Sequence, residues 1–331
     1  MRLIQLINSH GERRVCLVED DRLRLIGEHA SVYALAQVAL DSETSLAATV
    51  NRYLTADELD YNEIYTGRSA WRILPPIDHP NVPARCMVSG TGLTHKGSAA
   101  NRQAMHAADA APTDSMRMFQ WGLEGGRPAP DQVGVSPEWF YKGPGTILRA
   151  HGEPLEVPDY GEDGGEEGEL AGVYLIDSTG VPRRLGMTVG NEFSDHRVEK
   201  KNYLYLATSK LRTCAIGPEL VIDPDYSSVS GEVRIERDGV PMWTKPILTG
   251  DAAMSHSLAN MEHHHFKHAA HRRPGDIHLH FFGAAALSFG DGVELIDGDI
   301  MQISFAGFGR PLRNPVRINQ ATESPVSVYP L

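Results

Sequence analysis

The sequence predicts a β-rich α+β protein rather than a doubly wound parallel sheet. Its C-terminal third alternates short strand-like runs with turns, and few segments there have helical spacing. Apolar residues make up 41% of the chain, which is enough for a substantial core. With 331 residues and no internal repeat, the chain is expected to form one large domain and one small domain.

The first 75 residues are expected to form the small domain, of α+β type. Two short apolar runs flank the turn sequence SHGE at 9–12 and predict a pair of strands. Residues 31–54 carry apolar side chains at helical spacing. Four prolines within 74–84 then indicate a linker, because proline lacks an amide donor and disfavours helix. Residues 76–331 are assigned to the larger domain.

The larger domain begins with a predicted strand, a glycine-containing loop and a helix over residues 85–105. Residues 115–145 have little periodicity and many Gly and Pro residues, so we expect a lid or binding loop there. Residues 165–177, GEEGELAGVYLID, predict an acidic turn that leads into a buried strand. Further along, Asp238 and Gly239 predict the turn of a β-hairpin.

The charge balance narrows the class of partner. The formal net charge is −12 and no basic stripe stands out, which argues against nucleic acid and against an anionic membrane surface. The three cysteines, Cys16, Cys86 and Cys214, lie far apart and predict free thiols rather than a disulfide framework. The N-terminal residues do not resemble a signal peptide, and no apolar run is long enough to span a membrane. We therefore expect a cytoplasmic soluble protein.

Two carboxylates at the start of the buried strand are the first sign of chemistry. Side chains alternate along a strand, so Glu167 and Glu169 point the same way, roughly 7 Å apart. Burying two unpaired carboxylates is costly, and a divalent cation such as Mg²⁺, Mn²⁺ or Ca²⁺ would neutralise them. The pattern alone also fits a pair of solvent-facing glutamates, so it leaves both readings open.

A third carboxylate strengthens the case for a metal. Glu192 follows the strand-like run at 185–190 and can return to the same site through a hairpin. Lys210 follows 18 residues later, near the end of a semi-polar segment. The sequence thus offers three carboxylates and a cationic side chain for one site.

The order of these motifs resembles the fumarylacetoacetate hydrolase family. That family has an ExE pair, a strand ending in Asn-acid-x-Ser, a lysine and then a GPELV-like strand; here these are 167–169, 191–194, Lys210 and 217–221. The resemblance extends over roughly residues 80–318. The further segments that carry it are YKGPGTILRAHGEPLEVP (141–158), RPGDIHLHFFG (273–283) and LIDGDIMQISFAGFGRPLRNPV (295–316).

The resemblance implies a mixed β-roll catalytic domain with a small N-terminal α+β domain, and a catalytic Mg²⁺ for which Mn²⁺ or Ca²⁺ could substitute. The implied metal ligands are Glu167, Glu169 and Glu192, although the family usually has Asp at the third position. Lys210 matches the family's active-site lysine, whose pKa a nearby cation and partial burial would lower. Lys142 matches the lysine of the family's Lys-Pro segment.

Departures from the family pattern suggest which branch the chain resembles. The His of the water-activating His-Glu pair is replaced by Ser98, with His95 close by, and His196 stands where Arg is usual. The family's Thr-Gly-Thr-Pro loop becomes HFFG at 280–283. These substitutions resemble the branch that dehydrates 2-keto-3-deoxy sugar acids. The candidate substrate-binding residues are Ser98, Thr94, Phe282 and Gly283.

The resemblance therefore implies a hydro-lyase that converts a 2-keto-3-deoxy pentonate to 2,5-dioxopentanoate in pentose or aldonate catabolism. A general base near C3 and an acid near the C4 oxygen are required. Lys210 is the first candidate for contact with the keto oxygen or for proton transfer, followed by Lys142, Glu199 and His280; a purely structural role is the alternative for each. We expect a small 2-keto acid as substrate and a homodimer or higher homo-oligomer.

Two other functions remain open. One is an acylpyruvate or 2,4-diketo-3-deoxy sugar acid hydrolase on the same metal scaffold, which would split the carbon chain. The other is a non-catalytic sugar-acid-binding protein, which the three retained acidic positions disfavour. The missing His at position 98 favours dehydration.

A histidine tract within the helix expected over 251–273 offers a competing metal site. His264, His268 and His271 could share one helical face, but no HExxH pattern is present. We therefore expect the tract, His263 to His271, to pack at a surface or a subunit contact. A role beside the HFFG segment and binding of Zn²⁺ are the alternatives.

Overall fold

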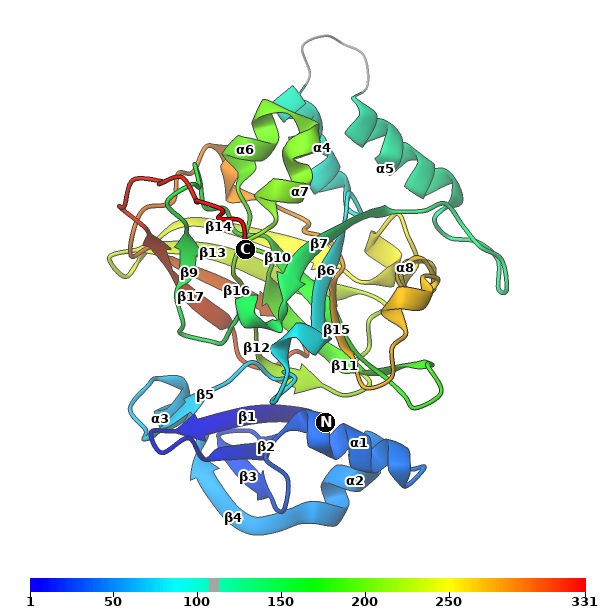
Figure 1. Cartoon of the computed structure of the whole chain (residues 1–331), viewed down its shortest axis with the longest axis vertical. Helices are drawn as coiled ribbons and strands as arrows, with labels where there is room; N and C mark the ends of the chain where they lie inside the picture. The colour runs from blue at the N-terminus through cyan, green and yellow to red at the C-terminus, as the bar shows by residue number, and fades with distance from the viewer. Residues whose placement is uncertain (107–112) are drawn as a thin grey trace.

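The computed structural model describes residues 1–106 and 113–331. Within these residues the strands form two mixed sheets, one of 12 strands and one of five. The predicted β-rich α+β class is therefore confirmed. The sheets occupy the middle of the molecule, helices α4 to α7 gather at one end, and the N-terminal elements lie at the other (Figure 1).

The large sheet runs in the order β4-β3-β2-β1-β12-β11-β10-β15-β6-β7, with β5 beside β1 and β8 beside β12. Its strands are β1 (Arg2–Asn8), β2 (Arg13–Glu19), β3 (Arg22–Ile26), β4 (Leu54–Asp60), β5 (Trp71–Ile73), β6 (Cys86–Gly92), β7 (Glu138–Pro144), β8 (Leu148–Arg149), β10 (Gly168–Ile176), β11 (Pro182–Asn191), β12 (Cys214–Val221) and β15 (Ile277–Phe281). The smaller sheet runs in the order β14-β13-β16-β17-β9. Its strands are β9 (Leu155–Val157), β13 (Val229–Arg237), β14 (Val240–Thr249), β16 (Ile300–Phe305) and β17 (Leu312–Ile318).

The α-helices connect the strands and cover the ends of the sheets. They are α1 (Val32–Asp41), α2 (Leu46–Tyr53), α3 (Tyr61–Tyr65), α4 (Lys96–His106), α5 (Asp114–Gly125), α6 (His196–Lys201), α7 (Leu206–Ser209) and α8 (Leu258–Phe266). Short 3₁₀ turns lie between them, of which η5 (Ala269–His271) and η6 (Ser288–Asp291) bear on the argument below. No helix among the described residues is both long and apolar enough to cross a bilayer.

The N-terminal strands continue the large sheet of the rest of the chain. β1 pairs with β12 in antiparallel fashion, with Leu3 opposite Leu220. Glu219, which is fully buried, accepts hydrogen bonds from Tyr61 Oη (2.8 Å), Arg2 Nη1 (2.9 Å) and the amide of Arg310 (3.0 Å). Because a buried carboxylate needs such partners, Glu219 fixes residues 1–75 against the larger part of the chain.

Several local predictions are confirmed. β6 and α4 form the expected strand, loop and helix, and β13 and β14 form the expected hairpin. Asp238 and Gly239 have φ values of 52° and 77°, as a two-residue turn of this hairpin type requires.

The prediction of an irregular segment at 115–145 is wrong. It contains most of α5 and all of β7. Thr113 caps α5, because its Oγ1 accepts the amide hydrogen of Met116 (3.3 Å). The Gly and Pro residues concentrate between the two elements, at 125–137, so their density concealed an ordinary helix and strand.

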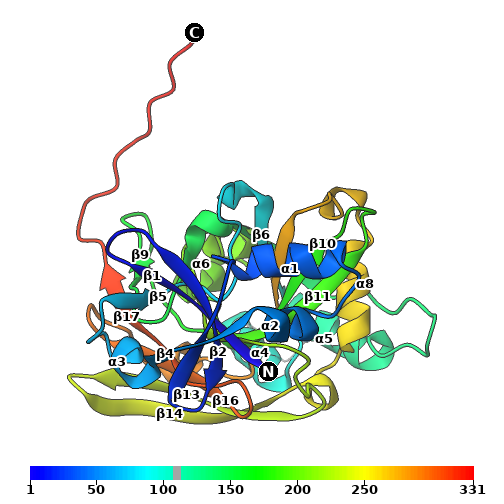
Figure 2. The ribbon, with the colours of Figure 1, turned by 90° about the horizontal axis from the view of Figure 1, so that it is seen from below.

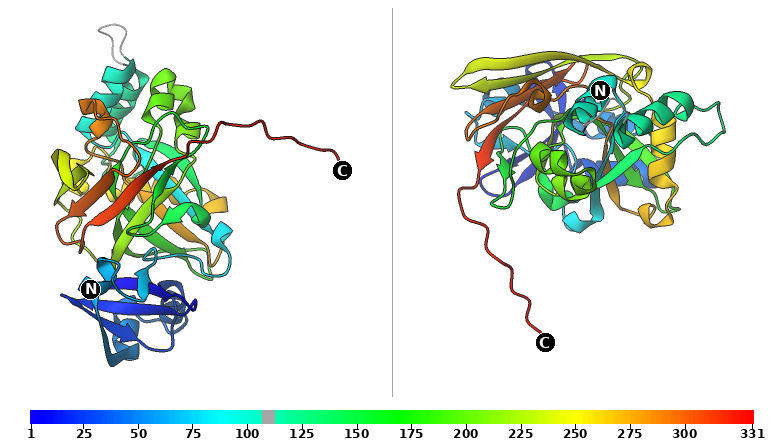
Figure 3. Two further views of the ribbon diagram at one scale, coloured as in Figure 1. Left: turned by 90° about the vertical axis from the view of Figure 1, so that its left-hand side faces the viewer. Right: turned by 90° about the horizontal axis from the view of Figure 1, so that it is seen from above.

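The main core packs between the two sheets. Its members include Leu170 and Val189 from the large sheet and Val233 and Ile303 from the smaller one. Beyond Ile318 the chain leaves the body and extends into the surroundings (Figures 2 and 3). The functional candidates lie at the end of the large sheet where β10 begins and β11 ends, on the side of the molecule that carries α4 and α6 (Figure 1).

Candidate metal centre

The hairpin of β10 and β11 brings three carboxylates to one end of the sheet. Glu169 lies opposite Gly190, and the amide of Glu192 continues the ladder by donating to the carbonyl of Glu167 (2.9 Å). One carboxylate oxygen from each of Glu167, Glu169 and Glu192 lies within 4.8 Å of the others. All three residues are buried. The convergence expected from the sequence is present.

Two buried lysines contact two of these carboxylates. Lys210 Nζ lies 2.5 Å from Glu167 Oε1 and 2.6 Å from Glu192 Oε2. Lys142 Nζ lies 2.5 Å from Glu192 Oε1 and also donates to the carbonyls of Phe193 (2.6 Å) and Lys210 (2.9 Å). Three partners use all three donors of an ammonium group, so Lys142 is held in one position.

Glu169 has no cationic partner among the described residues. Its Oε2 accepts the amide hydrogen of Gly283 (2.6 Å), a neutral donor that does not balance the charge of an ionised carboxylate. Burial, together with Glu192 and Glu167, raises the pKa of Glu169 well above its usual range. The chain therefore leaves one unneutralised acidic group in a dry site.

The pKa values of Glu167 and Lys210 follow from their contacts with each other and with their neighbours. Burial opposes ionisation of Glu167, but Lys210 and His196 more than offset it and hold its pKa well below its usual range. Burial also opposes a charge on Lys210, yet Glu167 and Glu192 raise its pKa. The two carboxylates act in this direction because they lie at hydrogen-bond distance from Nζ, whereas the lowered pKa expected from the sequence depends on a cation beside Lys210. Lys210 is an ammonium group at neutral pH.

The donor set fits a hard divalent cation. Carboxylate oxygens are the ligands that Mg²⁺, Mn²⁺ and Ca²⁺ bind, and three of them converge here from the two ends of one hairpin. The observation within this chain that calls for a cation is Glu169, because its ionised form has no cationic partner among the described residues. Glu167, Glu169 and Glu192 would hold the ion.

A chain of hydrogen bonds fixes the backbone segment that holds Glu169. Thr94 Oγ1 donates to the carbonyl of Phe282 (2.7 Å), so it accepts from His95 Nδ1 (2.9 Å), and His95 Nε2 accepts from Thr249 Oγ1 (3.0 Å). These roles are those of a neutral imidazole, which His95 is at neutral pH because burial lowers its pKa to about 4. The next residue after Phe282, Gly283, is the one that donates to Glu169.

Gly283 and Thr94 are in close contact at this point. The φ of Gly283 is +97°, and a Cβ there would lie 2.0 Å from Thr94 Oγ1. Thr94, Phe282 and Gly283, which we predicted to bind substrate, thus lie beside the glutamates and hold Glu169. The Ser98 hydroxyl donates instead to the carbonyl of His95 (3.0 Å) within the first turn of α4.

Helix α6 places two further ionisable groups nearby. His196 Nε2 lies 3.1 Å from Glu167 Oε1, and this contact raises the pKa of the imidazole despite its burial. Glu199, one turn along α6, is also buried. Sequence reasoning noted His196 only as a departure from the family pattern, although it contacts Glu167 directly.

Glu166 was missed altogether. It is fully buried and accepts from the amide (2.7 Å) and the hydroxyl (2.6 Å) of Ser288, which fixes the start of η6. The sequence signal was its place inside the acidic tract at 162–169, where a solvated turn was the simpler interpretation.

His280 belongs to a separate cluster. Its two ring nitrogens contact Ser89 Oγ (2.9 Å) and Thr91 Oγ1 (2.7 Å), and its ring lies 4.5 Å from that of His265. The expectation that the tract packs at a surface is wrong for His264 and His265, which are buried. His265 lies against His280 of the HFFG segment because α8 and β15 are neighbours in the fold. Helical spacing alone cannot predict which strand a helix will contact.

Comparison with known proteins identifies solved structures that share this fold. No protein-family profile and no curated protein matches the sequence. Among solved structures, apo 2-keto-3-deoxy-D-arabinonate dehydratase aligns with a TM-score of 0.71 and 23% identity over 97% of this chain and 100% of that one. The same enzyme complexed with magnesium and 2,5-dioxopentanoate aligns at 0.70, with the same identity and coverage.

A more distant structure is 5-carboxymethyl-2-hydroxymuconate delta-isomerase from Mycobacterium smegmatis. It aligns with a TM-score of 0.59 and 20% identity over 96% of this chain and 100% of that one. The chain therefore has the fold of the fumarylacetoacetate hydrolase family and, within it, resembles the dehydratases more closely than the isomerases.

Proposed function

We propose that the protein is a Mg²⁺-dependent dehydratase of 2-keto-3-deoxy sugar acids, with the conversion of a 2-keto-3-deoxy pentonate to 2,5-dioxopentanoate and water as its simplest form. The observation that carries this is the buried triad of Glu167, Glu169 and Glu192, in which Glu169 has no cationic partner among the described residues. The likeness to a dehydratase that was solved with magnesium and 2,5-dioxopentanoate supports the same reaction.

The ion would supply a Lewis acid that polarises the keto group and makes the C3 proton acidic. The chain itself supplies the charge pattern and the proton-holding groups. Lys210 donates to Glu167, Glu192 and Ser194 in the structure, and it would exchange one of these acceptors for a substrate oxygen on which negative charge develops. Two of the three acceptors of Lys142 are backbone carbonyls, which hold its ammonium group against Glu192, so we assign it a positioning role for Glu192.

The acid and base are assigned to α6. His196 contacts Glu167, which raises the pKa of the imidazole, and an imidazole can take up and release a proton. Glu199 lies one turn away on the same helix and is the second candidate. His280 has both nitrogens engaged by hydroxyl groups of β6, so we assign it to the histidine cluster rather than to proton transfer.

The test is a product assay with metal and variant controls. Purified protein with Mg²⁺ is incubated with 2-keto-3-deoxy pentonates of both configurations, and the products are identified by mass. The proposal expects a product 18 mass units lighter that keeps all five carbons, as loss of one water requires. Cleavage of the carbon chain would instead support the acylpyruvate-type hydrolase.

Glu169→Gln removes the ionisable group while keeping the size of the side chain. We expect this variant to fold and to lose Mg²⁺-dependent turnover, whereas Glu156→Gln, at an exposed position, should keep it. Full turnover by Glu169→Gln would remove Glu169 from the site. Binding of the acid with Mg²⁺ but without turnover by the unaltered protein would favour the non-catalytic sugar-acid-binding alternative.

A further inference from the structure

The imidazole of His196 has a hydrogen-bond partner on only one nitrogen among residues 1–106 and 113–331. Its Nε2 lies 3.1 Å from Glu167 Oε1, and its Nδ1 is buried without a partner. In sites where an imidazole transfers a proton, a hydrogen bond to the second nitrogen commonly fixes the orientation of the ring. The packing around His196 must therefore do what that hydrogen bond does elsewhere.

The backbone of Gly165 packs against one edge of this imidazole. A Cβ at position 165 would lie 2.0 Å from Nδ1 and 2.3 Å from Cε1 of His196, so a larger residue does not fit there. Gly165 is itself held by Ser194, because the amide of each donates to the carbonyl of the other, at 2.9 and 3.0 Å. This edge of the imidazole therefore lies on a backbone segment that is fixed in place.

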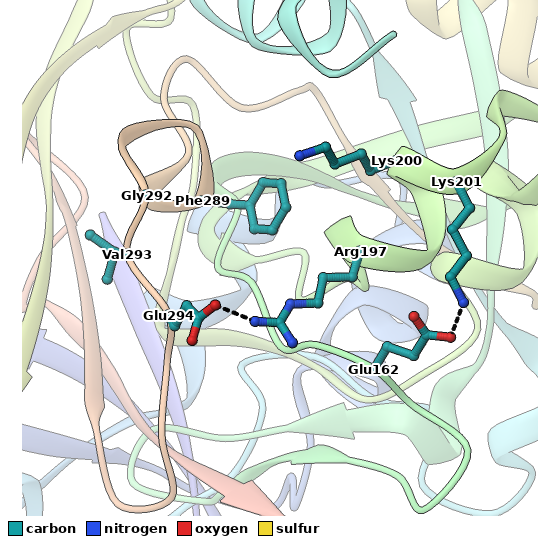
Figure 4. Close-up of a pocket in the computed structure, with 8 residues that line it drawn as sticks. All are labelled: Glu162, Arg197, Lys200, Lys201, Phe289, Gly292, Val293 and Glu294. Atoms are coloured by element: carbon teal, nitrogen blue, oxygen red, sulfur yellow. Dashed lines mark hydrogen bonds and ion pairs between the residues drawn. The ribbon is translucent and has the colours of Figure 1, made fainter.

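The phenyl ring of Phe289 also lies against the imidazole. The two ring centres are 5.3 Å apart and the planes are inclined at 51°. Figure 4 shows the phenyl ring projecting from its loop towards α6, the helix that begins at His196. Phe289 also lines a cavity of about 440 Å³, so other side chains do not enclose the ring on every side. Its position therefore depends on the backbone that carries it.

Glu166 fixes that backbone. It is fully buried, and its Oε1 accepts the amide hydrogen of Ser288 (2.7 Å) while its Oε2 accepts the hydroxyl hydrogen of the same residue (2.6 Å). Ser288 is the first residue of η6 and directly precedes Phe289. Both carboxylate oxygens of Glu166 thus hold the residue next to the phenyl ring.

We propose that Glu166 is a positioning residue for proton transfer by His196, and that it acts through η6 and Phe289. Three consecutive residues then serve one imidazole: Gly165 leaves room for it, Glu166 fixes the phenyl ring that packs on it, and Glu167 contacts its Nε2. This inference rests on the proposed function, in which His196 is assigned as acid or base. It gives the buried carboxylate of Glu166 a part in the reaction that is separate from metal binding.

Four substitutions separate this route from a general loss of structure. Glu166→Ala removes both acceptors, whereas Glu166→Gln can still accept from the amide of Ser288 and can donate to its hydroxyl oxygen. Phe289→Leu removes the phenyl ring but leaves the contacts of Glu166 in place, so it gives a result even if Glu166→Ala does not fold. Lys245→Gln is the matched control, because Lys245 Nζ lies 3.1 Å from Asp291 Oδ2 at the exposed end of the same turn.

The first measurement needs neither metal nor substrate. The NMR signal of His196 Cε1–H is recorded in the full chain labelled at histidine and is identified by its loss in His196→Gln. We expect Glu166→Ala to shift or broaden this signal, and Glu166→Gln and Lys245→Gln to leave it unchanged. An unchanged signal in folded Glu166→Ala would overturn the inference.

The second measurement is a double-mutant cycle on the turnover of a 2-keto-3-deoxy pentonate with Mg²⁺. We expect Glu166→Ala and Phe289→Leu each to lower kcat by roughly 10-fold or more, with KM changed by less than about 2-fold, and Glu166→Gln to restore kcat. In a His196→Gln background neither should lower kcat further. The same loss in both backgrounds, or full kcat in Phe289→Leu, would overturn the inference.

The outcomes separate the two levels of the argument. If the unaltered protein dehydrates the acid and His196→Gln keeps full kcat, the inference is wrong and the proposed function stands. If the unaltered protein dehydrates no 2-keto-3-deoxy acid, the proposed function falls, and the assignment of His196 to proton transfer falls with it. The NMR signal still decides in that case whether Glu166 orients the imidazole.

Discussion

Acid should lower the free energy of unfolding through the buried histidines, and the contribution of His278 can be calculated. Its Nδ1 lies 2.8 Å from His265 Nε2, in a pocket shared with His271 at 5.8 Å and Phe266 at 5.3 Å between ring centres. Burial, with a smaller effect of His271, lowers the pKa of His278 from its ordinary value of 6.5 to about 4. The nearest acid, Asp276, is engaged by Arg85 and Arg273.

The sign and the size follow from proton linkage. Between pH 6.5 and pH 4 the unfolded chain binds a proton at His278 that the folded chain excludes, so the free energy of unfolding falls as the pH falls through this window. The loss from this one residue amounts to about 2 kcal/mol at pH 5 and about 3 kcal/mol at pH 4. His280, with a pKa lowered to about 3, adds to the slope.

His278→Asn isolates this contribution. Trp139 Nε1 donates to His265 Nδ1, so His265 Nε2 carries the hydrogen and His278 Nδ1 accepts it. The Oδ1 of asparagine can accept the same hydrogen without titrating. Urea unfolding at pH 7.5 and pH 5, with each protein compared with itself, should show the variant losing about 2 kcal/mol less than the unaltered protein. The exposed control His10→Asn should lose as much as the unaltered protein, and equal losses for His278→Asn would refute the reasoning.

Three further predictions concern the metal centre. Lys142→Met removes one partner of a buried ion pair, so urea unfolding in EDTA should show the free energy of unfolding lowered by about 3–5 kcal/mol. Added Mg²⁺ should restore part of this loss. If the variant loses no stability, Glu192 does not depend on Lys142. Thr94→Val breaks the hydrogen bonds that hold Phe282 and, through Gly283, Glu169. Calorimetry should therefore show that the affinity for Mg²⁺ falls by about 10-fold or more. The control variant Ser98→Ala should change this affinity little. Mg²⁺ at about 100 times its dissociation constant should raise the free energy of unfolding of the unaltered protein by about 2.7 kcal/mol, and the same increase in Glu169→Gln would show that the ion binds elsewhere.

The parts of the site that sequence could predict are those set by strand geometry. Glu167 directly precedes β10 and Glu169 lies within it, so strand alternation predicted their common direction, and the hairpin to β11 returned Glu192 to the same end. The ordered motifs then identified Lys210 and Lys142 and the fold. Each of these depends on residues close in sequence or on a pattern that spans the chain.

The parts that sequence missed depend on contacts between distant segments. His265 is buried because Trp139, His278 and His280 surround it, and none of these lies on its own helix. Glu166 gained its role from Ser288, more than a hundred residues away. α5 was missed although Thr113 is a good N-cap residue, because the Gly and Pro residues beyond the helix dominated the pattern.

The central claim is that one divalent ion sits among three glutamates and holds a 2-oxo acid. A crystal grown with Mn²⁺ and 2-oxoadipate tests it directly through anomalous scattering. The account predicts one strong peak in contact with carboxylate oxygens of Glu167, Glu169 and Glu192, with the 2-oxo acid end of the ligand completing its coordination. A peak at the histidines around His265, or no peak among the three glutamates, would contradict it.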